Sequence, residues 1–255
     1  KFFVWLLEKT DDREIKDAIS NINILRVKPA YPFLLQVFSD YKKKIITKDN
    51  VLEIINLIQS YVFRRQIVGG TGTSGHNRTF ALLYSYVDKE NSQTYVESIK
   101  AALIRKQDYE RFPKDDEFST ELRQAENVYG MKSCIYMLLR LENFERTKEK
   151  INSENVTIEH IMPQDIHNSQ SWQDELGVDW RNIHPKIVNT LGNLTITELN
   201  SEMSNNSFKE KKEIAFDATP YHLSAGLRDL EHWNKDEIEK RSKKLTDLAL
   251  RIWEY

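Results

Sequence analysis

The first half of the chain has apolar residues at helical spacing. A helix that ends near Gln66 is expected because apolar positions recur at intervals of three and four residues. Its apolar face consists of Val51, Ile54, Ile55, Ile58 and Val62. The segment 68–77 then carries four of the chain's eight glycines and is predicted to be a loop. Further helices are expected at 80–86, 93–106 and 131–139, the last with a buried stripe.

The pattern changes after residue 150. The segment 155–161, NVTIEHI, is rich in β-branched residues and predicts a strand, and 191–197, LGNLTIT, predicts a second one. Between them, residues 164–186 are polar without a clear period, so we expect a long loop. The segment 200–216 is polar at first and then helical. The predicted order is therefore strand, loop, strand and helix.

The chain closes with a predicted helix. Asn234 and Glu237 have the spacing of a capping pair at its start. Its apolar stripe consists of Ile238, Leu245, Leu248 and Ile252. Together these patterns predict a mostly helical α+β protein, with a helical domain over residues 1–150 and a second domain over residues 151–255.

Composition narrows the function classes. The 255 residues are enough for two domains, each with its own core. The net charge of −2 argues against a protein that coats nucleic acid, but not against an enzyme that acts on DNA. A single cysteine, Cys134, excludes an internal disulfide and a cysteine zinc site, and it suits a reducing, cytoplasmic compartment. No apolar run approaches the roughly 20 residues of a membrane span.

The second domain carries a set of residues suited to phosphodiester hydrolysis. This reaction requires a base that takes a proton from water, and positive charge that offsets the charge developing on oxygen. Histidine suits the first task because its pKa lies near neutrality, and a hard divalent cation with oxygen ligands suits the second. Glu159 and His160 occur together in TIEHIMPQ, and they are followed by asparagines and by Lys209.

One geometric difficulty concerns the adjacent pair. Neighbouring residues of a regular strand face opposite ways, so Glu159 and His160 share a site only if the strand bends there. Pro163 follows closely and cannot continue a ladder, which favours such a bend. The alternative interpretation of His160 is a structural histidine whose polar atoms are satisfied by neighbours.

The ordered segments EHIMP, GNL and NSFK resemble the HNH signature of the His-Me finger, or ββα-metal, nucleases. More closely, several segments are similar to the C-terminal region of GmrSD-type modification-dependent (type IV) restriction endonucleases. These segments are YVFRRQIVG (61–69), TIEHIMPQ (157–164), LGNLTI (191–196), NNSFKEKK (205–212) and the closing 232–253. The resemblance implies a ββα-metal core embedded in helices within residues 151–255.

The resemblance also implies roles for individual residues. His160 matches the general base that activates water, and Asn193 matches the central asparagine that tethers the loop and orients this base. Glu159 matches the first metal ligand, where many HNH sites have the shorter aspartate. The implied metal is Mg²⁺ or Mn²⁺. From the residues alone, turn chemistry is the alternative for Asn193 after Gly192.

The second metal ligand and the phosphate contacts are less sharply defined. Asn200 follows the second strand directly and is the favoured ligand, with Asn205 and Asn206 as alternatives. Asn206, Lys209 and Lys212 are expected to contact nucleic acid. The alternative for the lysines is a solvated helix face. The same alternative applies to the clusters Arg64–Arg65 and 42–44, which could instead contact phosphate or an upstream domain.

The resulting hypothesis is a metal-dependent HNH endonuclease that hydrolyses DNA phosphodiesters, within a restriction-modification or antiviral defence enzyme. In the resembling family, a ParB-like NTP-hydrolysing domain precedes this region, and a start without methionine fits the expectation that this partner domain is missing from the chain. The rival hypothesis is a catalytically silent module on the same fold that binds nucleic acid or a protein partner.

Overall fold

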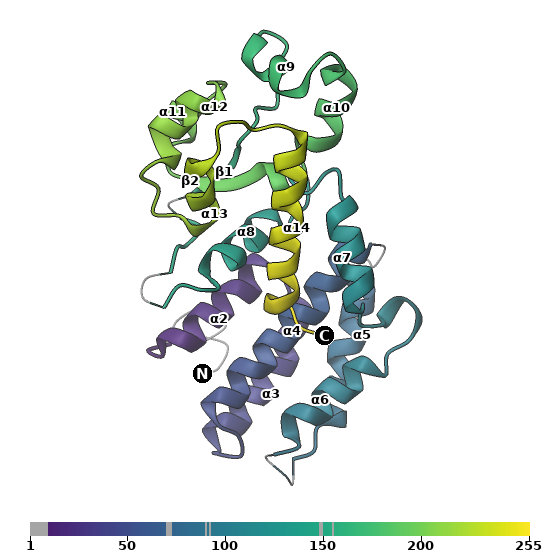
Figure 1. The fold of residues 1–255 in the computed structure, drawn as a ribbon. Coiled ribbons are helices and arrows are strands. Elements are labelled where there is room, and N and C mark those ends of the chain that lie inside the picture. The colour runs from purple at the N-terminus through teal and green to yellow at the C-terminus, as the bar shows by residue number, and fades with distance from the viewer. Residues whose placement is uncertain (1–9, 70–72, 90, 92, 148–149, 155) are drawn as a thin grey trace. The chain divides into compact units, whose positions relative to one another are not determined.

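The structure is a computed structural model, and it describes residues 10–69, 73–89, 91, 93–147, 150–154 and 156–255 (Figure 1). The described part is mostly helical, with one small antiparallel sheet of two strands. The chain divides into two compact units, Lys1–Phe118 with Trp253–Tyr255, and Ser119–Ile252. None of the described helices combines the length and apolar character that crossing a membrane requires.

The boundary between the units lies well before residue 150, where the sequence pattern changes. The reason is packing rather than element type. Helix α8 (Cys134–Asn143) is helical like the first unit, but it contacts α13 (His222–Ala225), α14 (Lys235–Ile252) and the second strand.

The first unit is built around α4 (Lys48–Val68), whose apolar face was predicted from spacing and is buried. Helix α4 begins with a capping box, in which Thr47 and Asn50 satisfy each other's backbone amides. It contacts α2 (Arg13–Ile24), α3 (Tyr31–Lys42) and α6 (Tyr95–Ile104). This arrangement removes most of α4 from water.

The cluster Arg64–Arg65 is buried, so the prediction of a solvated charge pair was wrong. The Arg64 guanidinium donates to the carbonyls of Trp253 and Pro113 and pairs with Asp115 at 2.6 Å. The Arg65 guanidinium donates to the Tyr61 hydroxyl and to the Tyr109 carbonyl, both at 2.6 Å. The two arginines therefore tie neighbouring segments of this unit together instead of facing phosphate.

The predicted loop over 68–77 is shorter than expected. Helix α5 (Thr73–Leu83) begins inside it, and residues 70–72 lie outside the described part of the chain. The reason is tertiary packing, because the rings of His76 and Phe80 pack against Tyr61 of α4. Helix α7 (Asp115–Gln124) follows α6 after a 3-10 turn at Asp108–Glu110.

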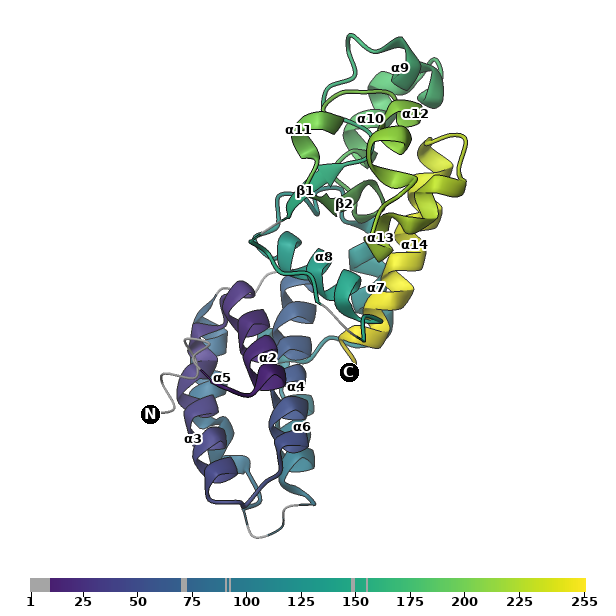
Figure 2. The same cartoon turned by 90° about the vertical axis from the view of Figure 1, so that its left-hand side faces the viewer.

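The second unit contains the sheet. Strand β1 (Thr157–His160) pairs antiparallel with β2 (Leu194–Thr197), and His160 lies opposite Leu194. Helices α11 (Asn200–Met203) and α12 (Phe208–Lys211) follow β2, and a π-helical turn continues to Phe216. Figure 2 shows β1 and β2 next to α13, with α14 running along the same unit. Asn234 caps α14 by accepting from the Glu237 amide at 3.2 Å, as predicted.

The segment 164–186 is not a simple loop, so that prediction was wrong. It forms α9 (Gln170–Leu176) and α10 (Trp180–Ile187), separated by Gly177 at a positive φ of 73°. Both tryptophans of the segment, Trp172 and Trp180, are buried in the core of this unit. The helical period escaped detection because each helix is short and Gly177 interrupts their common apolar face.

His76 makes the stability of the chain depend on pH. Its side chain is buried, and its Nε2 has no hydrogen-bond partner among the described residues. Burial, and then the charge of Arg65, lower the pKa of His76 to about 4. An unfolded histidine titrates near 6.5, so the unfolded state binds more protons between these values, and stability falls as the pH falls through this window.

We expect His76→Leu to weaken this dependence. Between about pH 7 and pH 5 the titration of His76 should remove about 2 kcal/mol from the free energy of unfolding, and the variant should lack this loss. Urea unfolding at the two pH values measures the difference. The control is His167→Leu, which replaces an exposed histidine. Equal acid sensitivity in the parent and His76→Leu would assign the effect to other groups.

Candidate active site around His160

Asn193 fixes the backbone around the end of β1. Its Oδ1 accepts from the Met162 amide at 2.8 Å and from Nε1 of Trp233 at 2.9 Å. Its Nδ2 donates to the carbonyls of Met162 at 2.9 Å and Val188 at 2.8 Å. The side chain is fully buried, so all the hydrogen-bonding capacity of this amide is used inside the protein. Asn193 thus ties the segment after His160 to the segment before β2.

Helix α14 holds the same region from the other side. A Cβ atom at Gly192 would lie 2.0 Å from the Ile238 carbonyl oxygen of α14, so only glycine allows this approach. The Arg241 guanidinium donates to the carbonyls of Gly192 at 2.6 Å and Leu194 at 2.8 Å. The turn Leu191–Asn193 and the start of β2 are therefore locked to a long, capped helix.

His160 is the last residue of β1 and is 8% exposed. Its Nε2 lies 2.9 Å from Oδ1 of Asn189. The ring of Tyr129 packs against the imidazole with centroids 4.5 Å apart and an interplanar angle of 62°. Asn189 and Tyr129 were not predicted from the sequence, since neither belongs to a motif. Asn189 lies 29 residues after His160 in the sequence, and only the fold brings the two side chains together.

The electrostatic surroundings keep His160 neutral. Burial lowers the pKa of the imidazole below its ordinary 6.5, the Asn189 hydrogen bond opposes this shift, and the charges of Lys211 and His184 add to it. An imidazole of this kind is unprotonated at neutral pH. Because Nε2 faces a carbonyl-type acceptor, it carries the hydrogen, and the lone pair belongs to Nδ1. None of the described residues hydrogen-bonds Nδ1.

Glu159 has a different partner. Its Oε1 lies 2.5 Å from Nζ of Lys211, and the same ammonium donates to the His160 carbonyl at 2.8 Å. Both side chains are buried. Burial raises the pKa of Glu159 and lowers that of Lys211, and the attraction between the two groups opposes both shifts. Since β1 stays in regular register with β2 through His160, Glu159 and His160 direct their side chains to opposite faces.

The remaining predicted residues lie near the Glu159 face or on the following helices. The Asn200 Nδ2 donates to the Ile158 carbonyl at 2.9 Å and to the Thr157 hydroxyl at 3.2 Å. The Asn206 Nδ2 donates to the Glu202 carbonyl, and the backbone carbonyl of Asn206 accepts from Nε1 of Trp172. The Lys212 ammonium donates to the Leu230 carbonyl at 2.6 Å. Asn205 and Lys209 are exposed.

Glu159 supplies a carboxylate of the kind that a hard divalent cation prefers, but the Lys211 ammonium already contacts its Oε1 at 2.5 Å. Thr157 and Glu159 share one face of β1 because alternate residues do, and the Asn200 Nδ2 donates to the Thr157 hydroxyl. Among the described residues, no group of three or more histidine, cysteine, aspartate or glutamate side chains could hold a metal. A site at Glu159 would therefore use amide oxygens as well, and Lys211 would be its immediate neighbour.

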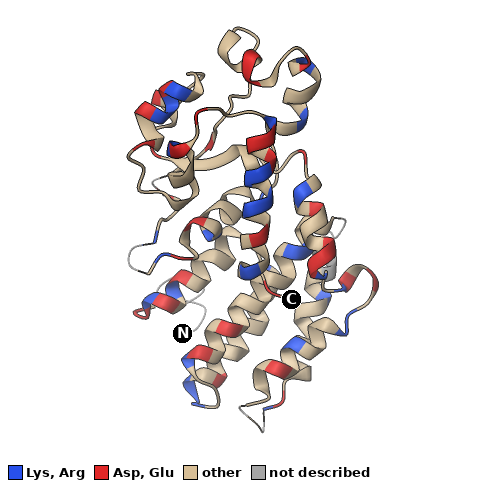
Figure 3. Cartoon of the chain, in the orientation of Figure 1, with Lys and Arg blue, Asp and Glu red and all other residues tan. Residues whose placement is uncertain are grey.

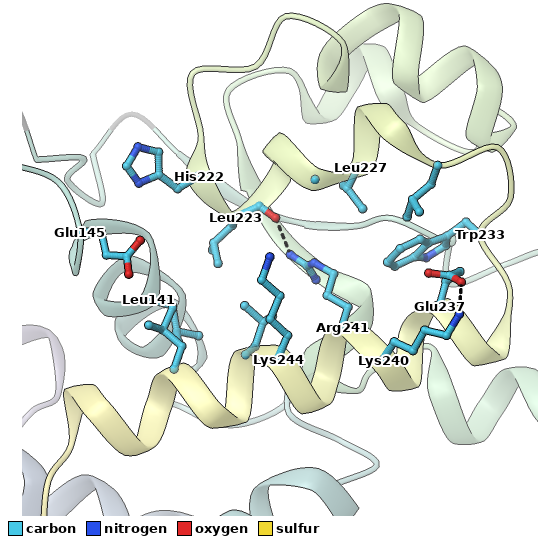
Figure 4. A pocket seen from close by; sticks show the side chains of 14 residues that line it. Leu141, Glu145, His222, Leu223, Leu227, Trp233, Glu237, Lys240, Arg241 and Lys244 are labelled. Atoms are coloured by element: carbon cyan, nitrogen blue, oxygen red, sulfur yellow. Dashed lines mark hydrogen bonds and ion pairs between the residues drawn. The ribbon is translucent and has the colours of Figure 1, made fainter.

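A cavity of about 310 Å³ lies elsewhere in the same unit, between α8, α13 and α14 (Figure 4). Its walls include Leu141 and Leu223, and Arg241 reaches across to the Leu223 carbonyl at 3.0 Å. The described residues that line it include none of the predicted site residues. The cavity and the His160 environment are therefore separate features, although Arg241 contributes to both.

Comparison with known proteins identifies one family. The family model described as GmrSD restriction endonucleases, C-terminal domain, matches residues 112–248, which is more than half of the chain. No curated protein matches the chain. The matched range contains β1, β2, α11, α12 and every predicted site residue.

The ion pair between Glu159 and Lys211 should be a strong determinant of stability. Lys211→Met leaves the buried Glu159 carboxylate without its cation, and removing one partner of a buried pair costs about 3–5 kcal/mol. The double variant Glu159→Gln/Lys211→Met should lose less stability than Lys211→Met, because no uncompensated charge remains. Urea unfolding of the parent, Lys211→Met and the double variant measures their free energies of unfolding.

Lys209→Met is the matched control for Lys211→Met. Lys209 is exposed on the same helix, so its replacement should change the free energy of unfolding by no more than about 0.5 kcal/mol. A Lys211→Met variant as stable as this control would show that the ion pair does not stabilise the fold.

Proposed function

The chain belongs to the family of GmrSD restriction endonucleases, whose C-terminal domain it contains, and from this premise we propose that its second unit is an HNH-type nuclease. The reaction is hydrolysis of DNA phosphodiester bonds. The observation that carries the proposal is the geometry of His160. Its imidazole ends a strand that Asn193 secures, its Nε2 faces Asn189, and its Nδ1 is left to accept a proton.

The order of elements supports the same proposal. Strands β1 and β2 pair antiparallel, and α11 and α12 follow them, which is the sequence of elements in a ββα core. His160 acts as the general base that takes a proton from water at Nδ1. Asn189 orients the imidazole of His160 through Nε2. Asn193 is a positioning residue that joins the backbone at Met162, after β1, to the backbone at Val188, before β2.

A divalent metal ion, Mg²⁺ or Mn²⁺, is part of the proposal. Glu159 and Asn200 would hold it through carboxylate and amide oxygens. Because Glu159 points to the face of β1 opposite to His160, one shared site requires the end of β1 to bend when the ion binds. When bound, the ion supplies positive charge that offsets the charge developing on the phosphoryl and leaving oxygens. Lys209 is the exposed lysine of α12 and would contact phosphate, together with the nearby Asn206. Lys212 is a weaker candidate because its ammonium is bonded to the Leu230 carbonyl.

The biological setting proposed for this activity is modification-dependent restriction of foreign DNA. In such an enzyme an upstream ParB-like domain that hydrolyses a nucleoside triphosphate would act together with this chain. The family membership supports this setting, and DNA is the substrate that it implies.

One observation favours the rival function, a catalytically silent binding module. The ammonium of Lys211 already neutralises Glu159, and His160 is only 8% exposed. The two functions differ in metal binding and in turnover. A nuclease binds Mn²⁺ in titration calorimetry and loses activity when the metal is chelated, whereas a silent module does neither.

His160→Ala tests the proposed base. We expect nicking of supercoiled plasmid in the presence of Mg²⁺ or Mn²⁺ to fall by about 10²–10⁴-fold, because the water loses its proton acceptor. His167→Ala is the control, since it removes an exposed histidine of the same unit and should retain the parent's rate. Parent-like cleavage by His160→Ala would exclude His160 as the base.

Asn189 variants test the orientation of this base through the pH profile. The base works when neutral, so activity falls as the pH falls through the pKa of His160, which lies below 6.5. The Asn189 hydrogen bond raises this pKa, so Asn189→Ala should shift the acid limb, which is the low-pH side of the pH–activity profile, to lower pH.

The loss of ring orientation in Asn189→Ala should also reduce kcat by about 10- to 100-fold. Asn189→Asp should move the limb the opposite way, because a carboxylate favours the imidazolium. An unmoved limb in both variants would rule out Asn189 as the orienting residue.

A further inference from the structure

Tyr129 combines exposure with contact to the proposed base. Its side chain is 41% exposed, although it packs edge-on against the imidazole of His160 with ring centroids 4.5 Å apart. An aromatic ring that only shielded His160 from water would gain from being buried itself. An exposed aromatic ring beside a phosphodiester-cleaving group is instead suited to contact the substrate.

The loop that carries Tyr129 is anchored on both sides of the ring. The Tyr129 amide donates to the Asn189 carbonyl at 3.1 Å, and Asn127 forms an isolated bridge with Asn189. Val128 is fully buried next to it. The Gly130 amide donates to Oδ1 of Asn127 at 3.0 Å, and a Cβ atom at Gly130 would clash with that side chain. These contacts fix the backbone on both sides of Tyr129, and the ring itself packs against His160.

Two amide side chains adjoin His160, which the Tyr129 ring contacts, because the Asn189 side chain bonds to the imidazole and Gln164 bonds to Asn189. The Asn189 side chain is half-buried, and the exposed Gln164 donates to its Oδ1 at 3.4 Å. Amide side chains of this kind bond to base edges and to phosphate oxygens. Aromatic rings stack on bases of any sequence, at about 1–3 kcal/mol per base. The chemistry of this patch fits a nucleotide with an accessible base face.

We propose that Tyr129 is a stacking platform for a nucleobase next to the scissile phosphate, and that the site takes an unstacked nucleotide. The inference rests on the proposed nuclease function and deepens it. A base within a regular duplex is stacked on its neighbours and offers no free face, so the ligand class is single-stranded, bulged or flipped DNA. Gln164 and Asn189 contact the polar groups of the same nucleotide.

The test measures binding rather than cleavage. Oligonucleotides that contain 2-aminopurine are titrated with the chain in EDTA, and both the affinity and the quenching of 2-aminopurine are recorded. Stacking on Tyr129 quenches the probe. We expect Tyr129→Leu to weaken binding of single-stranded DNA by about tenfold and to abolish the quenching. Tyr129→Phe should retain both, because it keeps the ring.

The choice of leucine separates stacking from a structural role. Leucine still covers His160 with apolar volume but has no aromatic face. If Tyr129 had only a structural role, Tyr129→Leu would bind single-stranded DNA as the parent does. Tyr109→Leu, at a more exposed tyrosine of the first unit, is the control and should bind as the parent does. Parent-like affinity and quenching in Tyr129→Leu would overturn the proposal. Because no turnover is needed, this outcome is distinct from a failure of His160→Ala to lose nicking.

Discussion

The buried amide of Asn193 is the interaction on which the candidate site depends. Four hydrogen bonds join it to the segment after β1, to Val188 and to Trp233. Replacing it with an apolar side chain would leave buried backbone and indole groups unpaired, which costs more than the bonds themselves contribute. The position of the imidazole follows from this tether, because His160 is the residue directly before the tethered segment and Asn189 directly follows Val188.

The pleat of β1 then separates two kinds of chemistry. Glu159 points to a face where an ammonium and amide groups gather, and His160 points to a face of neutral groups, Asn189 and Tyr129. Lys211 connects the two faces, since it bonds to the Glu159 carboxylate and to the His160 carbonyl. Its charge also contributes to the lowered pKa of the imidazole. A cation on one face therefore helps to keep the imidazole neutral on the other.

The sequence was sufficient for features set by local chemistry. The apolar period of α4, the two β-branched strands and the Asn234 cap depend on residues within a few positions of one another, and the structure contains all three. Features set by distant partners were not predictable. Arg64 is buried because carbonyls far along the chain accept from it, and Lys211 reaches Glu159 over 52 residues. The same limit applies to Asn189 and Tyr129, whose neighbours are determined by the fold alone.

The charge distribution bears on the role proposed for Tyr129 in binding DNA. Acidic and basic residues both occur along α14 (Figure 3). Several cations near the site are engaged internally, since Lys211, Lys212 and Arg241 bond to protein oxygens. The net charge of −2 gives the chain no overall positive charge that would concentrate phosphate. Stacking and short-range amide contacts do not require such a field, and they distinguish an open nucleotide from a paired one. In a chain with a net charge of −2, the proposed recognition by stacking would not depend on a positive field.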